Sequence, residues 1–438
     1  MNERNRDSDP TEQKGTDANA ARRSNAGHQG ITTFSSHNPE QPPGLRWFNR
    51  LGRPLRRLVS LSPDRLIAAA RKQAGDAGDQ PLAFEGPLRT LLDSLRYESD
   101  LHLAGRIAAY QDTLRLVRTQ LRMSAAFETE PEIAATELPQ PIFVTGMPRT
   151  GTTLLLSLLV QDPDHRCLKY WEGFDPLPSR GGPEEQERRT ANMLRGLDYT
   201  SPGYQAIHPM QADSPEECVM LFMHTFTTPQ LDIQYHVPRY MKWLDGIDRR
   251  ASYEHYRHQL QLIHRRRPMG KRMILKDPSH MFALDVILDV FPDARIVHIH
   301  RDPLVAVPSN CSLYAHTRAI FLHNIDTKAL GEHVLYGTWP DILDHSLALR
   351  ERIDGDRIVD VAYADLMREP LETMSRLYES LDLELSSGAC ERMAGWLNAN
   401  PQDKHGVHGY SLRQFGLSRE QVEERFADYR RRFDVAFE

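Results

Sequence analysis

Residues 141–155 read PIFVTGMPRTGTTLL and combine backbone and side-chain groups suited to binding a phosphate-like anion. Glycines let successive backbone N–H groups form an anion-binding concavity, an arginine supplies positive charge, and threonine hydroxyls supply further donors. The candidate ligands are Arg149, Thr150, Gly151, Thr152 and Thr153. The segment therefore predicts a site for a phosphate or a related group.

The elements around this loop are predicted by the apolar residues on each side. Residues 142–144 predict a buried strand, and residues 154–160 begin an apolar helix. At such a turn a parallel α/β sheet presents a helix N-terminus to an anion. A Walker A loop has Lys after its second glycine, where this chain has Thr152, and the cation here is the earlier Arg149. The pattern resembles the 5′-phosphosulfate loop, P-[KR]-[ST]-G-T-T, of sulfotransferases that use 3′-phosphoadenosine 5′-phosphosulfate (PAPS).

A second candidate site lies in residues 295–309, RIVHIHRDPLVAVPS. Residues 296–299 predict another core strand, which ends at Arg301 and is followed by a helix. In sulfotransferases such an Arg, with a Ser eight residues later, holds the 3′-phosphate of the cofactor, and Arg301 and Ser309 have that spacing. A planar guanidinium grips phosphate oxygens through paired hydrogen bonds.

A third segment, MILKDPSHMFALDVIL over residues 273–288, predicts a short strand ending at Lys276. It resembles the strand end where tyrosylprotein and related sulfotransferases carry a lysine that contacts the cofactor. The resemblance implies that Lys276 stabilises the leaving group. Without the resemblance, the same lysine would be interpreted as a solvated residue at a strand end.

From about residue 82 to the C-terminus the chain resembles a bacterial sulfotransferase-domain family, on these loops and on WEGFDPLP, IHPMQADSPEEC and HGYSLRQFGLSREQVEERFADYRRRF. The resemblance implies an α/β fold with a P-loop-NTPase-like parallel central sheet flanked by helices. It also implies a transferase that moves the sulfuryl group of PAPS to a hydroxyl or amine of a small-molecule, glycan or lipid acceptor. The alternative is a P-loop kinase or NTPase-like nucleotide-binding protein, which the absent Walker lysine disfavours.

The general base has several candidates. Glu172 follows the first helix near the place where tyrosylprotein sulfotransferases carry a catalytic Glu, and a carboxylate beside Trp171 in a closed pocket would be a better base because it is desolvated. The alternatives are His208 and the pair Glu216 and Glu217, while a salt-bridged or capping role for Glu172 stays open. The predicted catalytic residues are Glu172, Lys276, Arg149 and His208.

A metal is not expected. His298 and His300 share one face of a predicted strand, which would allow metal binding, but such histidines are more often ordinary strand residues. Arg149, Lys276 and a helix N-terminus supply the positive charge that the reaction needs.

Composition and cysteine spacing indicate which partners and which cellular compartment the protein can have. The 438 residues carry a net charge of −6, which argues against a surface built for nucleic acid. The four cysteines form no C-x-x-C pair, so we expect a reducing, cytoplasmic setting. Residues 1–44 are polar and predict disorder, residues 45–135 predict a helical accessory segment, and residues 136–438 predict the sulfotransferase domain.

Within that domain we expect a helical insertion, at about residues 178–268, to build the acceptor pocket. Its candidate lining residues are Tyr204, His208, Met210, Phe222, Tyr235, Tyr240 and Trp243. For each aromatic residue taken alone, a place in the core is the commoner outcome.

Residues 45–58 interleave arginines with Trp, Phe and Leu, a pattern that suits an anionic membrane surface. Gly52 and Pro54 interrupt any helix there, so we expect the segment to pack on its own domain, with at most weak membrane contact.

Overall fold

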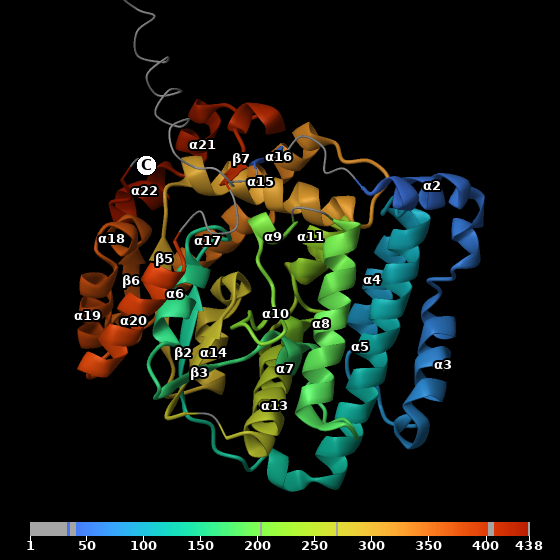
Figure 1. Ribbon diagram of the computed structural model, residues 1–438, viewed down its shortest axis with the longest axis horizontal. Helices are drawn as coiled ribbons and strands as arrows, with labels where there is room; N and C mark the ends of the chain where they lie inside the picture. The colour runs from blue at the N-terminus through green and yellow to red at the C-terminus, as the bar shows by residue number, and fades with distance from the viewer. Residues whose placement is uncertain (1–32, 36–40, 202–203, 269, 402–406, 437–438) are drawn as a thin grey trace, which may run out of the picture.

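The fold is built on a five-stranded, wholly parallel sheet with the strand order β3-β4-β2-β5-β6 (Figure 1). The computed structural model describes residues 33–35, 41–201, 204–268, 270–401 and 407–436. The strands are β2 (Gln140–Thr145), β3 (His165–Cys167), β4 (Arg272–Lys276), β5 (Arg295–His300) and β6 (Ile358–Ala362). The strands predicted at 142–144, 273–275 and 296–299 and their parallel arrangement are confirmed.

Alternate residues of each strand point to opposite faces of the sheet, and helices bury both faces. Ile142 and Val144 of β2 lie in one hydrophobic cluster, whereas Phe143 between them lies in another. The first cluster is covered by α6 (Thr152–Leu159), α18 (Tyr363–Arg368), α19 (Pro370–Ser380) and α20 (Ser387–Ala399). The second is covered by α10 (Val219–Met223), α13 (Arg250–Arg266), η4 (Pro278–Ala283), α14 (Leu284–Val290) and α17 (Thr338–Arg350).

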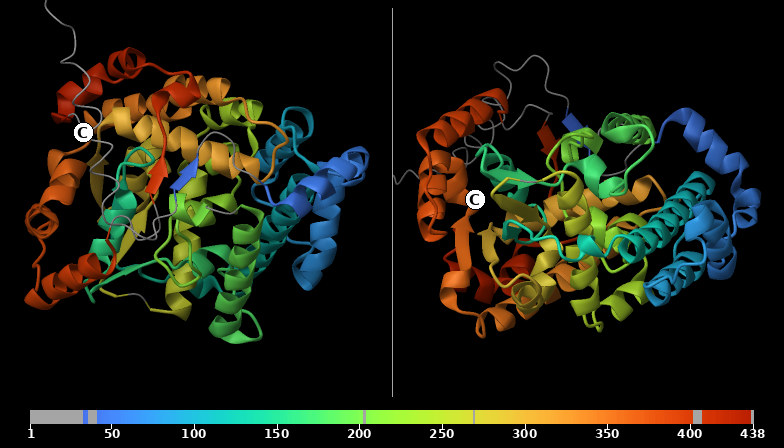
Figure 2. Two further views of the ribbon diagram at one scale, coloured as in Figure 1. Left: turned by 45° about the horizontal axis from the view of Figure 1, so that its top comes forward. Right: turned by 90° about the horizontal axis from the view of Figure 1, so that it is seen from below.

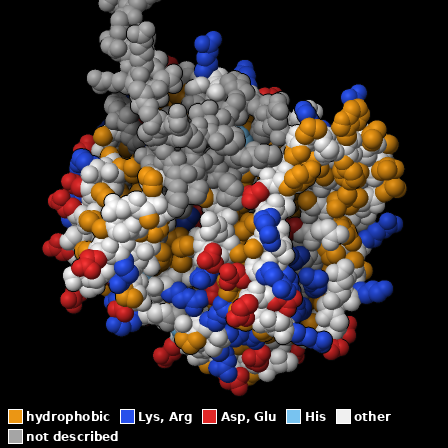
Figure 3. All heavy atoms as spheres, viewed as in Figure 1, with side chains coloured by type: hydrophobic (Ala, Val, Ile, Leu, Met, Phe, Trp, Pro, Cys, Tyr) orange, Lys and Arg blue, Asp and Glu red, His pale blue; other side chains and the backbone are white. Residues whose placement is uncertain are grey.

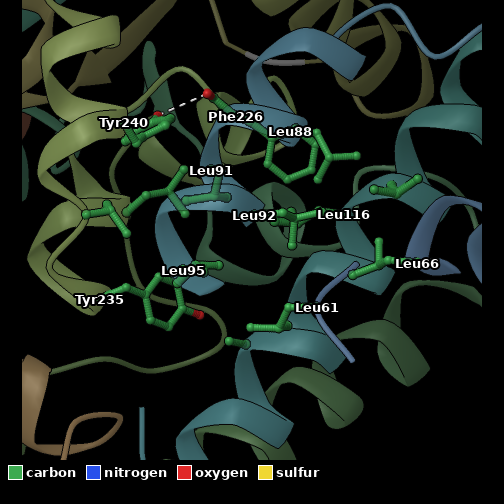
Figure 4. Close-up of a cluster of buried hydrophobic side chains, with 14 of the residues drawn as sticks. Leu61, Leu66, Leu88, Leu91, Leu92, Leu95, Leu116, Phe226, Tyr235 and Tyr240 are labelled. Atoms are coloured by element: carbon green, nitrogen blue, oxygen red, sulfur yellow. Dashed lines mark hydrogen bonds between the residues drawn. The ribbon is translucent and has the colours of Figure 1, made fainter. Parts of the chain in front are cut away.

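The N-terminal helices lie on the far side of the molecule from α18, α19 and α20 (Figure 1). They are α2 (Pro43–Leu51), η1 (Arg53–Leu58), α3 (Pro63–Ala74), η2 (Gly75–Ala77), α4 (Glu85–Tyr97), α5 (Leu103–Thr129) and η3 (Pro131–Ile133). Residues such as Leu88 and Leu92 pack with Phe226 and Tyr240 from the middle of the chain, and the Tyr240 hydroxyl donates to the Phe226 carbonyl at 3.0 Å (Figure 4). The accessory helices therefore share their core with the insertion.

The predicted insertion consists of helices and loops in its described part. The helices are α7 (Tyr170–Phe174), just before it, α8 (Gly182–Thr200), α9 (Tyr204–Ile207), α10, α11 (Gln230–Tyr235), α12 (Pro238–Leu244) and α13. Of the predicted lining residues, Phe222, Tyr240 and Trp243 pack in hydrophobic clusters away from the cavity described below. Tyr204, His208, Met210 and Tyr235 do line that cavity.

The remaining helices come from the C-terminal part of the chain. Its elements are α15 (Pro303–Ala319), α16 (Thr327–Tyr336), η5 (Gly355–Arg357), η6 (Leu412–Phe415), α21 (Arg419–Arg425) and α22 (Ala427–Phe433). A separate parallel pair joins β1 (Thr33–Ser35) to β7 (Val407–Gly409) (Figure 2).

Most of the tail predicted to be disordered lies outside the described residues, so that expectation stays a prediction. Among the described helices, none has the length and apolar composition needed to cross a bilayer.

Candidate active site

The parallel sheet brings the three predicted segments together at one edge. Gly146 follows β2, Asp277 follows β4 and Arg301 follows β5, and these three strands are direct neighbours. Tyr363 follows β6, the next strand along. In parallel α/β folds ligands bind beyond this carboxyl edge of the sheet.

Two positions of the loop require glycine, because a side chain there would clash with neighbouring atoms. Gly151 has φ +96°, and a Cβ there would lie 2.3 Å from the ring of Tyr363. Gly146 has φ +151°, and a Cβ there would lie 2.5 Å from the carbonyl oxygen of Ile299. Arg149 itself has φ 72°, a conformation that side-chain-bearing residues rarely adopt. The backbone is therefore held in a tight loop that ends at the N-terminus of α6.

Thr150 differs from the other predicted ligands of this loop. Its side chain is fully buried, and its hydroxyl donates to the carbonyl oxygen of Met147 at 2.7 Å. Of the predicted ligands in this loop, Arg149, Gly151, Thr152 and Thr153 are among the described residues that line the cavity, but Thr150 is not. This placement favours a role for Thr150 in shaping the loop.

Arg149, Arg301 and Ser309 form one connected group. Nε of Arg149 donates to the hydroxyl oxygen of Ser309 at 3.0 Å, and Nη1 of Arg301 donates to the carbonyl oxygen of Arg149 at 3.1 Å. The guanidinium of Arg301 also lies over the ring of Tyr363, 4.1 Å from its centroid. Burial lowers the pKa of Arg149, although a guanidinium stays charged at any physiological pH. The group places two cations and a hydroxyl beside the glycine loop.

A cavity of about 1300 Å³ connects this group to the helical side of the molecule. Near the sheet it is lined by the loop, Arg301, Tyr363 and residues of α20. On the other side it passes between α5, α8, α10 and α11, where apolar residues line it beside polar ones such as Gln111, Asp112 and Arg115. Members of this apolar lining are Phe174, Met193, Met220, Met223, Ile233 and Ile320. The cavity thus joins a cationic end to an apolar end.

Lys276 is not among the described residues that line the cavity, but it lies directly behind two that are. Its side chain is only 2% exposed, its ammonium forms an ion pair with Glu217, and it donates to the Thr153 hydroxyl at 3.3 Å. Glu217 and Thr153 both line the cavity. Burial is the largest single influence on the pKa of Glu217 and would raise it, but the charge and hydrogen bond of Lys276 together with the charges of His208 and Arg149 lower it below the usual 4.5. Glu217 is therefore an ionised carboxylate at neutral pH.

Three more titratable groups surround this pair. Burial and the charge of Glu217 raise the pKa of Glu216 to about 7, and the same two causes raise that of Asp277 to about 7. Burial lowers the pKa of His208 to about 4, so its ring is neutral at pH 7. Nε2 of His208 lies 4.0 Å from a carboxylate oxygen of Glu216. Glu217 is the member of this cluster whose charge is secured by a direct cation.

Glu172 lies apart from the cluster. Its carboxylate is 2% exposed and forms ion pairs with Arg166 and, at 3.3 Å, with Arg267, while it also accepts from the backbone N–H of Lys169 at 3.0 Å. Arg267 in turn covers the ring of Trp171, 4.0 Å from its centroid. Glu172 is not among the described residues that line the cavity. These contacts favour the salt-bridged, helix-capping role over that of a base.

Replacing Glu172 by Gln is therefore expected to reduce stability and not turnover. The change leaves two partly buried arginines without their carboxylate, and we expect a loss of about 1–3 kcal/mol in the free energy of unfolding. Urea unfolding of the variant and of the wild type measures this difference. A variant of unchanged stability that loses turnover at 20–25 °C would restore Glu172 as the base.

His298 and His300 lie with Asp360 in a group whose ligand atoms are within 4.8 Å of one another. Arg350 occupies this group: its Nη1 donates to Asp360 at 2.8 Å and contacts Nδ1 of His298 at 3.1 Å. His300 also stacks on Phe433, with ring centroids 3.9 Å apart. The negative charge of Asp360 is thus already balanced by a guanidinium.

No signal in the sequence points to Tyr363 as a residue of the candidate site. It begins α18 outside any recognisable motif, and only the neighbouring positions of β5 and β6 bring it to Arg301. Glu217 was one of the alternatives for the base, and its distinguishing feature, the contact with Lys276, joins residues 59 positions apart.

Comparisons with known proteins identify the family of the chain. A model of the sulfotransferase family matches residues 141–387. The omega-hydroxy-beta-dihydromenaquinone-9 sulfotransferase Stf3 of Mycobacterium tuberculosis (strain CDC 1551 / Oshkosh) is 31% identical over 258 residues, which cover 56% of this chain and 63% of that relative.

Two crystal structures are similar over most of their length. Sulfotransferase STF1 of Mycobacterium tuberculosis H37Rv is 33% identical with a TM-score of 0.72, and the match covers 83% of this chain and 98% of that one. Sulfotransferase STF9 of Mycobacterium avium is 29% identical with a TM-score of 0.74, covering 86% and 97%. The motifs, the sheet and these matches together establish that the chain belongs to the sulfotransferase family.

Proposed function

We propose that this protein transfers the sulfuryl group of PAPS to a hydroxyl group on a lipophilic acceptor. The observation that carries the proposal is one cavity that joins Arg149, Arg301 and the glycine loop to Glu217, whose ion-pair partner Lys276 lies directly behind the lining. A sulfuryl donor needs both features, because its phosphate groups must be held and its leaving group must be neutralised.

The residues around the loop fit the donor. The glycine loop leads into α6, whose first residues Thr152 and Thr153 line the cavity, and the N-terminus of this helix suits the 5′-phosphosulfate. Arg301 and Ser309 suit the 3′-phosphate, and Arg149 is hydrogen-bonded to both residues. When bound, the donor supplies a sulfuryl group attached to a phosphate leaving group.

Lys276 and Glu217 suit the chemical step. The acceptor oxygen forms a bond to sulfur as the bond between sulfur and the phosphate oxygen breaks, and the acceptor proton must go to a base. Glu217 is ionised and can take this proton, which would cancel its charge. The Lys276 ammonium would then be released from its ion pair to stabilise the developing charge on the leaving phosphate. One proton transfer thus serves both ends of the reaction.

The apolar part of the cavity suggests the class of acceptor. Methionine, phenylalanine and isoleucine side chains line it on the helical side, so a long apolar molecule with a terminal hydroxyl would fit better than a sugar. The name of the related Stf3 describes an acceptor of this kind, an omega-hydroxylated menaquinone.

Incubation of the purified protein with PAPS and a lipid extract tests the proposal. We expect release of 3′-phosphoadenosine 5′-phosphate (PAP) and a lipid whose mass has increased by one sulfuryl group. Sulfation confined to water-soluble alcohols would contradict the acceptor class. Hydrolysis of ATP with Mg²⁺, without any use of PAPS, would favour the kinase or NTPase alternative.

Arg301→Ala should weaken PAP binding by about 2 kcal/mol or more, because the 3′-phosphate would lose a charge-assisted partner. Isothermal titration calorimetry with PAP measures this loss, and a ligand lacking the 3′-phosphate should lose less. Arg295→Ala is the matched control, because Arg295 lies at the opposite end of the same strand and pairs with Asp356. Equal PAP affinity of wild type and Arg301→Ala would contradict the assignment of Arg301 to the 3′-phosphate.

The identity of the base predicts the pH dependence of turnover. Glu217 acts in its ionised form, and its lowered pKa means that kcat at saturating donor should hold from neutral pH down to about pH 5. If Glu216 were the base, protonation with a pKa of about 7 would already reduce kcat by half near neutrality. Steady-state kinetics across this range, with circular dichroism to verify folding, distinguishes the two carboxylates.

A further inference from the structure

The helix α2 packs on the protein with its polar side. Its buried residue is Asn49, whereas Trp47 is 60% exposed and Leu51 is 70% exposed. The apolar residues Leu55 and Leu58 of η1 are exposed as well, at 52% and 78%. A helix on a globular surface normally turns its apolar side inward. Here the usual orientation is reversed.

Specific hydrogen bonds hold this reversed orientation. Oδ1 of Asn49 accepts from the backbone N–H of Ala104 at 2.9 Å, and Nδ2 donates to Gln41 at 3.1 Å. Gln41 in turn donates to the carbonyl oxygen of Ala319 at 2.7 Å. Gly52 lies so close to Leu103 that a Cβ would approach its side chain to 2.1 Å. The apolar side of α2 is therefore fixed toward solvent.

Positive charge accompanies these apolar side chains. Residues 43–58 contain five arginines and no acidic residue, although the chain as a whole has a net charge of −6. Arg56 pairs with Asp100 at 2.9 Å, while the arginines at 46, 50, 53 and 57 are exposed. A surface hollow is lined by Arg50, Arg53, Arg56, Arg57 and Pro54. Figure 3 shows orange side chains gathered, with blue ones at their edges, where Figure 1 places α2.

We propose that α2 and η1, residues 43–58, form a docking surface for a membrane that contains anionic lipids. Trp47, Phe48 and Leu51 would enter the boundary between headgroups and acyl chains, and the arginines would contact lipid phosphates. Basic charge beside exposed aromatic and aliphatic residues favours this partner over a second copy of a chain that is itself acidic.

The docking surface adjoins the cavity. Leu45 of α2 lines the cavity, as do Ala104 and Ala108 of α5, the helix to which α2 is bonded. A lipophilic acceptor would therefore reach the apolar part of the cavity from the membrane side. This consequence rests on the proposed function, whereas membrane docking itself does not.

Co-sedimentation of the full chain with vesicles tests the proposal. Wild type should bind vesicles of phosphatidylcholine with phosphatidylglycerol at least about tenfold more tightly than vesicles of phosphatidylcholine alone, and added salt should weaken the binding. Arg50→Glu with Arg53→Glu should reduce binding about tenfold or more, and so should Trp47→Ser with Leu51→Ser. The matched controls are Arg188→Glu with Arg257→Glu and the exposed Tyr336→Ser, which should bind like wild type.

Equal binding to both kinds of vesicle, or equal losses in the control variants, would overturn the docking surface. It would also be overturned if wild type did not bind vesicles and the α2 variants instead changed the oligomeric state in sedimentation equilibrium. PAP affinity in solution should be unchanged in the α2 variants, which shows that they are folded. Vesicle binding without sulfuryl transfer would refute the proposed function and leave the docking surface standing.

Discussion

Replacing Glu217 by glutamine should lower kcat by a factor of about 10² to 10⁴ without weakening PAP binding. Glutamine keeps the size of the side chain and an oxygen for Lys276, but it cannot take a proton from the acceptor. The ion pair with Lys276 keeps Glu217 ionised, and the cavity gives it access to an acceptor. Single-turnover kinetics with PAPS and a sulfated lipid product measures the loss directly.

Glu172→Gln is the matched control for this prediction, since it makes the same change to a carboxylate outside the cavity lining. It should keep kcat while losing stability, the opposite of Glu217→Gln. If Glu217→Gln retains kcat and either Glu216→Gln or His208→Ala loses it, the base is another member of the cluster.

Replacing Lys276 by methionine should lower kcat by about 10² or more and change PAP affinity much less. Methionine fills a similar volume in this buried position, so the main loss is the positive charge beside the leaving phosphate. That charge matters most in the transition state, where the bond between sulfur and oxygen is breaking. Parallel measurements of kcat and of PAP binding by calorimetry separate the two effects.

Lys271→Met is the control for Lys276→Met. Lys271 is exposed, pairs with Asp164 at 2.8 Å and lies just before β4, at the far end from Lys276. It should leave kcat unchanged. Equal losses of kcat and PAP affinity in Lys276→Met would make Lys276 a binding residue and not a transition-state contact.

The sheet and its ligand-binding edge were predictable because their signals are local. Short apolar runs predict β2, β4 and β5, and glycine spacing predicts the loop between β2 and α6. The convergence of Arg149, Arg301 and Ser309 follows once the strands are parallel neighbours. Each motif directly follows its strand in the sequence, so parallel strands bring the motifs to the same edge of the sheet.

The choice among the candidate bases could not be made from the sequence, because it depends on contacts between distant residues. Glu172 follows Tyr170 and Trp171, and Glu217 precedes an apolar stretch, yet Arg267 pairs with the first and Lys276 with the second. Arg267 lies before the start of β4 and Lys276 lies at its end, which no local pattern records. The same holds for α2, whose outward apolar side depends on Asn49 meeting Ala104 on a helix far along the chain.

The donor site is the central claim, and the affinity of the wild-type protein for PAP compared with adenosine 5′-monophosphate tests it most directly. Calorimetry should show PAP binding more tightly by about 30-fold or more, because Arg301 and Ser309 meet a phosphate that the monophosphate lacks. Magnesium should not be needed for this difference. Equal affinity for the two nucleotides, or binding of ATP with Mg²⁺ in preference to PAP, would contradict the account.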